Sequence, residues 1–187
     1  CLADRQLGEY FIVDANGGLS VETALRFLRL LPSHADIVLE APCATWREHM
    51  SLRKRTSIPM VWDELATSDA AIAQLISDDG AEGVGLKISK NGGLTPCRRQ
   101  RDMCIAAGYS LSVQDTVGSD IAFAAIAHLG QTIPAHLLRC ILDTRDMVSI
   151  TTADATHKGG FDRRDGWVTA PSSPGLGIDP RMDVLGE

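Results

Sequence analysis

A charged side chain stands at the end of each of six short apolar runs in the sequence. Neighbouring members of this set are 23 to 28 positions apart, and the set is Asp14, Glu40, Asp63, Lys87, Asp115 and Asp143. That interval is the length of one strand followed by one helix, so the charges recur in phase with a repeating unit. Because parallel strands end at one edge of a sheet, we expect these side chains to gather where α/β proteins bind ligands and carry out catalysis.

The first three of these charges are carboxylates, which repel one another when they are brought together. A cation between Asp14, Glu40 and Asp63 would remove the repulsion, and ligands that are all oxygen select a hard ion. Mg²⁺ is the natural candidate, because it takes oxygen ligands from carboxylates, waters and substrate. Any one of these acids could equally be a solvated loop residue or a helix cap. Three of them in phase favour a magnesium site.

Lys87 follows an apolar run and lies next to the expected metal site. Partial burial and a nearby divalent cation both lower the pKa of a lysine, and a neutral amine at this place can act as a general base. The alternative is a surface lysine that pairs with a strand-end carboxylate. The three neighbouring carboxylates favour the base.

Two further features are candidates for binding a substrate. The glycine-rich turn Lys90–Gly93 precedes a helix start at Thr95 and Pro96, and the N–H groups at a helix N-terminus attract anions. Trp46 and Trp62 follow Glu40 and precede Asp63, so they could form walls of a pocket, although core packing is the usual role of a tryptophan.

The hydrophobic periodicity alternates between strands and helices. Strands are expected at 10–13, 36–39, 58–62, 83–88, 109–113 and 137–142, and helices at 20–31, at 70–76, from Thr95 and at 121–129. Ser20 and Ser68 are expected N-caps. The segment between the second and third strands reads as a loose polar stretch. This alternation predicts a parallel sheet with helices outside it, either doubly wound or closed into a barrel.

The composition of the chain changes near residue 150. Residues 1–150 carry the alternating elements, with no linker between 10 and 145. Residues 151–187 are rich in Gly, Pro, Thr and Asp, and we expect them to form a loop and tail with little regular structure that packs on the body.

Composition excludes several classes of protein. The chain has 187 residues, of which 44% are hydrophobic, and a net charge of −6. No apolar run approaches the roughly 18 residues that span a bilayer, and no basic stretch is interleaved with aromatic residues, so neither a membrane nor a nucleic acid is an expected partner. The five cysteines have no C-x-x-C or zinc spacing, which indicates reduced thiols in a cytoplasmic protein.

Five motifs in one order resemble the enolase superfamily, in particular its mandelate racemase and muconate lactonizing branch. The motifs are Val13–Gly17, Leu39–Pro42, Asp63–Glu64, Leu86–Gly93 and Pro174–Gly177. The resemblance implies an α/β fold of the (β/α)8 TIM-barrel type. It also implies that Asp14, Glu40 and Asp63 bind Mg²⁺ and that Lys87 is the acid/base. The chemistry of this superfamily is removal of a proton α to a carboxylate, which gives an enediolate.

The chain departs from the superfamily in its length. Members carry an N-terminal α+β capping domain and two more barrel strands, the second of which ends in a Lys-x-Lys pair, and this sequence contains neither. A complete barrel takes about 250 residues. We therefore expect a partial barrel with about the last six β/α units and without the capping domain. Because residue 1 is Cys rather than Met, we also expect the chain to begin inside a longer protein.

Within the branch, segments 40–46 and 112–120 resemble members that act on proline derivatives. The resemblance implies dehydration of cis-3-hydroxy-L-proline to Δ1-pyrroline-2-carboxylate. Asp143 or Asp115 would hold the ring ammonium, and the other expected substrate contacts are Asn16, Trp46 and Lys90. Two alternatives stay open: a racemase or epimerase of proline betaine or another amino-acid derivative, and a non-catalytic barrel fragment that binds a carboxylate. Relatives of this kind are often oligomers, so a homo-oligomer is also expected.

Overall fold

The computed structural model describes residues 10–143, 145, 161 and 163–185, and its main feature is one six-stranded sheet. The strands are β1 (Phe11–Asp14), β2 (Ile37–Glu40), β3 (Met60–Trp62), β4 (Gly83–Lys87), β5 (Ser110–Gln114) and β6 (Leu138–Ile141). They lie in chain order, and every neighbouring pair is parallel. The connecting helices are α1 (Val21–Leu30), α2 (Trp46–Arg53), α3 (Asp69–Ser77), α4 (Leu94–Ala106) and α5 (Asp120–Gly130).

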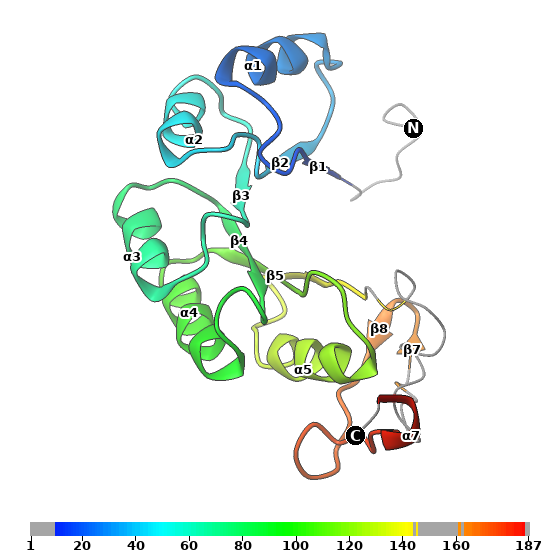
Figure 1. Cartoon of the computed structure of the whole chain (residues 1–187). Coiled ribbons are helices and arrows are strands. Elements are labelled where there is room, and N and C mark those ends of the chain that lie inside the picture. Colours follow the sequence, from blue (N-terminus) through cyan, green and yellow to red (C-terminus); the bar gives the residue numbers. More distant parts are fainter. Residues whose placement is uncertain (1–9, 144, 146–160, 162, 186–187) are drawn as a thin grey trace.

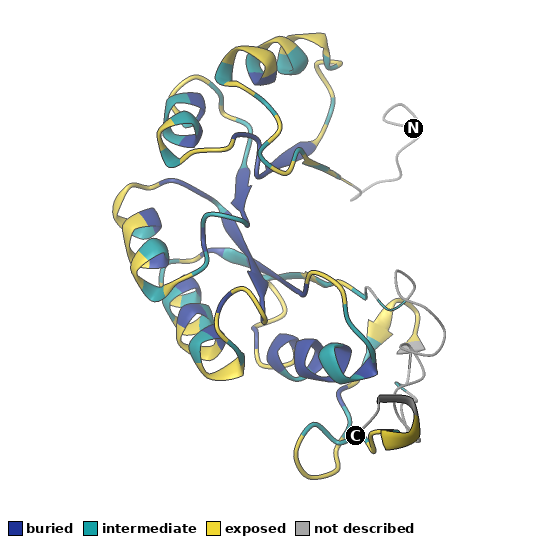
Figure 2. Ribbon diagram, viewed as in Figure 1, coloured by how far each residue is buried: buried dark blue, intermediate teal, exposed yellow. Residues whose placement is uncertain are grey.

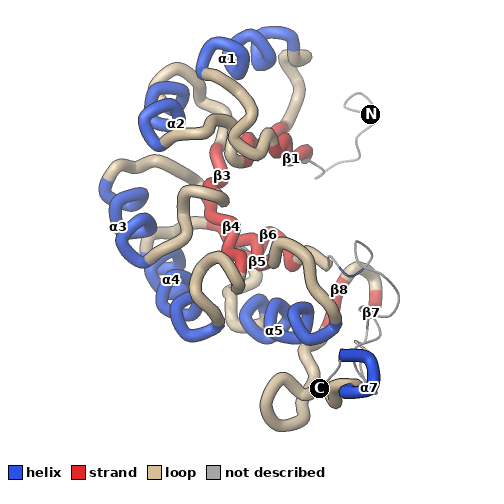
Figure 3. The backbone as a smooth tube through the Cα atoms, in the orientation of Figure 1, coloured by secondary structure: helices blue, strands red, loops and turns tan. Residues whose placement is uncertain are grey.

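The sheet is curled, and all five connecting helices lie on its convex side (Figure 1). The tube view shows the same arrangement, with the strands along the inner side of an arc of helices (Figure 3). A doubly wound sheet would carry helices on both faces. The fold is therefore a half-barrel, which confirms the expectation of a partial TIM barrel.

Side chains alternate between the two faces of the sheet. Apolar residues of successive strands belong to the core that packs under the helices, among them Leu39, Trp62 and Leu86, which are at most 1% exposed. The helices contribute Leu52 and Leu75 to the same core. Figure 2 shows the central strands β2 to β5 largely buried and the outer faces of α1 to α4 exposed, whereas the edge strands β1 and β6 are only partly buried. The alternate residues face the concave side, so the apolar layer leaves that side to polar groups.

The expected N-caps of two helices are confirmed. Ser20 accepts a hydrogen bond from the N–H of Thr23 at 3.2 Å, and Ser68 accepts one from the N–H of Ala71 at 3.1 Å. The expected start of α4 at Thr95 and Pro96 is wrong. Its N-cap is Gly93, with φ 98° and no side-chain cap, because glycine reaches this conformation without steric cost.

The segment between β2 and β3 contains a helix where the sequence pattern predicted a loose polar stretch. Helix α2 has few apolar residues, so its hydrophobic periodicity is weak. Its first turn is instead stabilised by a capping box, in which Thr45 Oγ1 accepts from the N–H of Glu48 at 3.3 Å and donates to Glu48 Oε2 at 2.7 Å. The pattern Thr-x-x-Glu is typical of a helix N-terminus, so it could have predicted the start of α2 from the sequence.

The C-terminal segment packs against α5. It contains a short hairpin of β7 (Arg163–Arg164) and β8 (Trp167–Val168) and the short helix α7 (Met182–Leu185). The N–H of Ala170 donates to Gln131 Oε1 at 3.1 Å, and the carbonyl of Leu176 lies 3.1 Å from His128 Nε2. The expected loop at 151–160 lies outside the described residues.

The structure also describes the cysteines and the lengths of the helices. Within the described residues, Cys43, Cys97, Cys104 and Cys140 are all free thiols. In the same part of the chain, no helix is long and apolar enough to cross a membrane.

Two leucines allow the packing of the half-barrel to be tested. Leu75 is 0% exposed and Leu30 is 85% exposed. We expect Leu75→Ala to lower the free energy of unfolding by about 2–5 kcal/mol, because it leaves a cavity under the helices. Leu30→Ala should change it by less than about 0.5 kcal/mol. Urea unfolding followed by circular dichroism measures both, and equal effects would contradict the described core.

Candidate functional site

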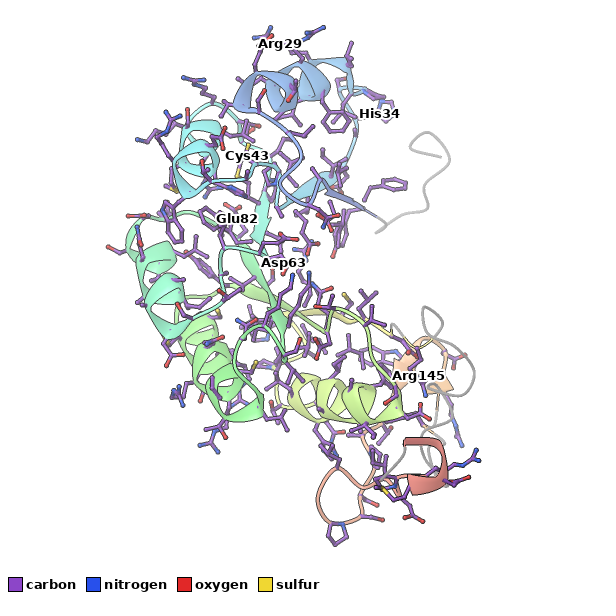
Figure 4. All side chains as sticks on the ribbon, in the orientation of Figure 1. Arg29, His34, Cys43, Asp63, Glu82 and Arg145 are labelled. Carbon is purple, nitrogen blue, oxygen red and sulfur yellow. The ribbon has the colours of Figure 1, made fainter. Side chains whose placement is uncertain are left out.

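The parallel strands place the predicted charges at one edge of the sheet, and four of them lie on the neighbouring strands β1 to β4 or directly after them. Asp14 and Glu40 are paired Cα partners at the ends of β1 and β2. Asp63 directly follows β3, and Lys87 ends β4. Figure 4 shows Asp63 on the concave side of the sheet, beyond the end of its strand.

Three of these four side chains are buried together. Glu40 is 8% exposed, Asp63 3% and Lys87 9%, whereas Asp14 is exposed. Gly85 leaves room for them, since a Cβ atom there would lie 2.9 Å from Gln114 Nε2 and 3.5 Å from Glu40 Oε1. A side chain at this position would therefore fill the space in which the polar groups converge.

Lys87 is paired with Asp63. Its Nζ donates a hydrogen bond to Asp63 Oδ2, and the two groups form a buried ion pair. Burial acts to lower the pKa of Lys87, but the hydrogen bond and charge of Asp63, helped by the charges of Glu64 and Glu40, raise it above its usual value. The lowering of this pKa was expected beside a bound divalent cation. In the described structure Lys87 pairs with a strand-end carboxylate, which is the alternative that the sequence left open.

The carboxylates carry more charge than one lysine can balance. Burial and the charges of Asp14 and Asp63 raise the pKa of Glu40 to about 7, against the opposing effects of Lys87 and a hydrogen bond from Gln114. Burial also raises the pKa of Asp63, although Lys87 opposes it. A cation at this place would stabilise both ionised forms.

The donor set fits a hard cation, because Asp14, Glu40 and Asp63 offer only carboxylate oxygens. In the part of the chain that the structure describes, no group of three or more His, Cys, Asp and Glu side chains is arranged so that it could hold a metal ion. Two of the carboxylates have protein partners instead. Asp63 binds Lys87, and Asp14 accepts hydrogen bonds from the N–H of Asn16 at 2.9 Å and from Asn16 Nδ2 at 2.8 Å. An ion shared by the three would compete with these partners.

Asn16 connects two strand ends. Besides its bonds to Asp14, its Nδ2 lies 3.3 Å from Glu64 Oε1, in the loop after β3. Its backbone has φ 45°, a left-handed conformation that asparagine tolerates better than most residues. The residue was predicted to contact substrate, and the structure places it between Asp14 and Glu64.

The two acids predicted to hold a ring ammonium are engaged by other groups. Asp115 accepts hydrogen bonds from the hydroxyl and backbone N–H of Ser89, the latter at 3.2 Å. Asp143 forms a bidentate pair with Arg145, with both N–H···O distances at 2.8 Å. Arg145 also binds Asp120, the first residue of α5, and lies over the ring of Phe123. Figure 4 shows it beside that helix. Asp143 is therefore paired with a cation, whereas the described partners of Asp115 are neutral donors of Ser89.

The remaining predicted contacts differ in their placement. Lys90 is exposed, and its charge acts to lower the pKa of Asp63, so it lies within electrostatic reach of the site. Trp46 has its described contacts away from this site. Its Nε1 donates to Asp78 Oδ2 at 2.9 Å, and its ring packs at 4.4 Å on that of Trp62, in the core under the helices.

Sequence reasoning missed polar residues that support the site. Gln114 is 8% exposed and hydrogen-bonds Glu40, and Asn91 is 4% exposed in the turn after Lys87. The alternation of Ser110, Ser112 and Gln114 along β5 was a usable signal, because it marks the face of that strand that lies away from the apolar core.

A curled parallel sheet with carboxylates and a lysine at the carboxyl ends of its strands is the site architecture of (β/α)-barrel proteins. The family model described as "Enolase C-terminal domain-like" matches residues 3–184. The chain belongs to this family, in the mandelate racemase and muconate lactonizing branch of the enolase superfamily.

Individual relatives agree with this assignment. Cis-3-hydroxy-L-proline dehydratase of Roseibium aggregatum is 37% identical over 179 residues, which are 96% of this chain and 47% of that protein. A structure from Aspergillus oryzae, named for the mandelate racemase/muconate lactonizing family, has 65% identity and a TM-score of 0.94 over all of this chain and 50% of its own. A structure from Roseovarius nubinhibens, complexed with magnesium, has 55% identity and a TM-score of 0.94 over the same share of each chain. The chain thus spans about half the length of these relatives.

Glu40 should make the stability of the metal-free protein depend on pH. Its pKa is raised to about 7 in the folded state, so the folded state binds the proton more tightly than the unfolded state does. The stabilisation is fully present below the unfolded pKa and is lost as the pH rises through the folded pKa. We expect the free energy of unfolding in EDTA to fall by up to about 3 kcal/mol between pH 5 and pH 8.

The matched variant for this measurement is Glu40→Gln, which removes the titrating group and keeps the shape. Urea unfolding at each pH should show a flatter profile for the variant than for the parent. Identical profiles for the two proteins would show that Glu40 does not titrate in this range.

Proposed function

We propose that this protein removes a proton from the carbon α to a carboxylate of a small-molecule substrate, with Lys87 as the base and with Asp14, Glu40 and Asp63 as ligands of Mg²⁺. The observation that carries the proposal is the burial of Glu40, Asp63 and Lys87 together at adjacent strand ends. Burying charged groups together costs desolvation free energy. Clusters of titratable groups with perturbed pKa values are typical of active sites.

The choice of Mg²⁺ rests on the all-oxygen donor set and on the relative from Roseovarius nubinhibens that is complexed with magnesium. Bound Mg²⁺ would supply positive charge that holds the substrate carboxylate and stabilises the negative charge that develops on it when the α-proton leaves.

The protein groups have separate tasks in this proposal. Lys87 Nζ takes the α-proton, so it must first give up the proton that its pairing with Asp63 favours. Asp63 therefore links the two halves of the site, because it pairs with the lysine in the described structure and would become a ligand of the ion when the ion binds. Lys90 adds positive charge near the site, which favours an anionic substrate.

The specific reaction we propose is dehydration of cis-3-hydroxy-L-proline. Lys87 takes the α-proton, and return of that proton to the 3-hydroxyl as its C–O bond breaks releases water and leaves an enamine, which tautomerises to Δ1-pyrroline-2-carboxylate. The similarity to the dehydratase of Roseibium aggregatum supports this choice of substrate.

A racemase or epimerase is the second candidate. D-Ala-D/L-Ala epimerase of Cytophaga hutchinsonii is 28% identical over 92% of this chain. N-succinylamino acid racemase of Amycolatopsis is 27% identical over 94%. Such a reaction would use the same proton abstraction, and it requires a second base on the opposite face of the substrate.

Proton NMR in D₂O separates these candidates. The full-length protein with Mg²⁺ is offered cis-3-hydroxy-L-proline and proline betaine in parallel. Disappearance of the hydroxyproline signals and appearance of the cyclic imine would support the dehydratase, whereas deuterium at the α-carbon of the betaine without elimination would support the epimerase. No exchange with either substrate would contradict the dehydratase and the proline betaine epimerase and leave only the superfamily assignment.

Lys87→Ala tests the base directly. We expect this variant to lose α-proton exchange by at least about 10²-fold, because general-base catalysis contributes that much, while it still binds Mg²⁺. Lys54→Ala is the matched control, since Lys54 is exposed at the end of α2 and should leave exchange unchanged. Exchange is followed by NMR and Mg²⁺ binding by calorimetry. Exchange at the parent rate in Lys87→Ala would rule out Lys87 as the base.

A further inference from the structure

The backbone of Lys87 has no strand partner on the side of β3. Strand β3 ends at Trp62, and its last pairing with β4 is Trp62 with Val84. Both backbone groups of Lys87 bind Asn91 instead. The N–H of Lys87 donates to Asn91 Oδ1 at 3.0 Å, and the N–H of Asn91 donates to the carbonyl of Lys87 at 2.8 Å. The side chain and the backbone N–H of Asn91 thus replace the missing strand as hydrogen-bond partners of Lys87. Buried backbone groups require such partners.

The other end of this amide reaches the loop that carries Asp63. Asn91 Nδ2 donates to the carbonyl of Ala66 at 2.9 Å, and the N–H of Ala66 donates to the carbonyl of Asp63 at 2.9 Å. A continuous path of hydrogen bonds therefore joins the backbone of Lys87 to the backbone of Asp63. It runs in parallel with the ion pair that joins their side chains.

A second buried amide holds Asn91 in this orientation. Asn91 Nδ2 also donates to Gln100 Oε1 at 2.7 Å, and Gln100 Nε2 donates to Asp69 Oδ1 at 2.9 Å. Asn91 and Gln100 are 4% and 1% exposed. With both N–H groups of its amide and its oxygen bonded, Asn91 cannot turn without leaving a buried polar group unsatisfied.

We propose that Asn91 is a positioning residue, which fixes the end of β4 against the loop after β3 and so sets where Lys87 meets Asp63 and the substrate. This role rests on the proposed function of Lys87 as the base. Asn91 touches neither Lys87 Nζ nor a carboxylate ligand in the described structure, so it acts through the backbone.

Removing the amide should affect rate more than binding. Asn91→Ala frees the end of β4 to move, and displacement of a reacting group by about 1 Å can cost about 10²-fold in rate. We expect kcat for α-proton abstraction to fall by about 10- to 100-fold. Because Asp14, Glu40 and Asp63 are unchanged, KM and the Mg²⁺ dissociation constant should stay within about threefold of the parent, the span of an effect below 1 kcal/mol.

The experiment compares three variants of the full-length protein: Asn91→Ala, Asn91→Asp and Tyr109→Phe. Asn91→Asp keeps an oxygen that can accept from the N–H of Lys87 but loses the donor to Ala66. Tyr109→Phe is the matched control. It removes one buried hydrogen bond, from the Tyr109 hydroxyl to the carbonyl of Leu75 at 3.1 Å, in a residue that precedes β5 and lies outside the site. Melting temperature, kcat, KM, Mg²⁺ affinity and the hydrogen exchange of the Lys87 amide are measured for each.

We expect the Lys87 amide to exchange at least about tenfold faster in Asn91→Ala, and at the parent rate in Asn91→Asp and Tyr109→Phe, because only the first variant loses its acceptor. A purely structural role predicts instead that Asn91→Ala and Tyr109→Phe lose stability alike and keep kcat, and that result would overturn the proposal. An unchanged exchange rate of the Lys87 amide in Asn91→Ala would also overturn the proposal. The hydrogen exchange of the Lys87 amide can be measured without turnover. If the proposed function fails, the parent protein has no activity, but the exchange measurement still tests the role of Asn91. The two failures are therefore distinguishable.

Discussion

Two carboxylates and one lysine are buried side by side at the carboxyl edge of the half-barrel, and their charges must be balanced there. Asp63 and Lys87 form an ion pair, and Glu40 lies beside them. Burial, and next the charges of Asp14 and Asp63, raise the pKa of Glu40 to about 7. The excess of negative charge would favour a cation at this site.

The scaffold makes this concentration of charge possible. Parallel pairing places all strand ends at one edge, and alternation sends Leu39, Trp62 and Leu86 to the helices while Glu40, Asp63 and Lys87 lie at the strand ends. Gly85 keeps the space between them open. The short strands leave backbone groups unpaired near the site, and polar side chains such as Asn91 and Asp115 bind them. The loops are thereby ordered by the same kind of polar contact that forms the site.

The fold and the main site residues were predictable because they depend on short-range patterns. Six apolar runs in phase predicted six strands, and the charges that follow them predicted the edge where Asp14, Glu40, Asp63 and Lys87 meet. Partners across the fold were not predictable. The sequence did not show which carboxylate pairs with Lys87, nor that Asp143 pairs with Arg145. It also left two roles open for Trp46, and only the contact with Trp62 shows that this side chain packs against the core.

A crystal structure of the full-length protein grown with Mg²⁺ tests the central claim most directly. We expect one ion bonded to oxygens of Asp14, Glu40 and Asp63, with Lys87 Nζ turned from Asp63 towards the space above Gly85. An ion bound elsewhere, or a structure in which saturating Mg²⁺ leaves the pairing of Lys87 with Asp63 and of Asp14 with Asn16 unchanged, would contradict it.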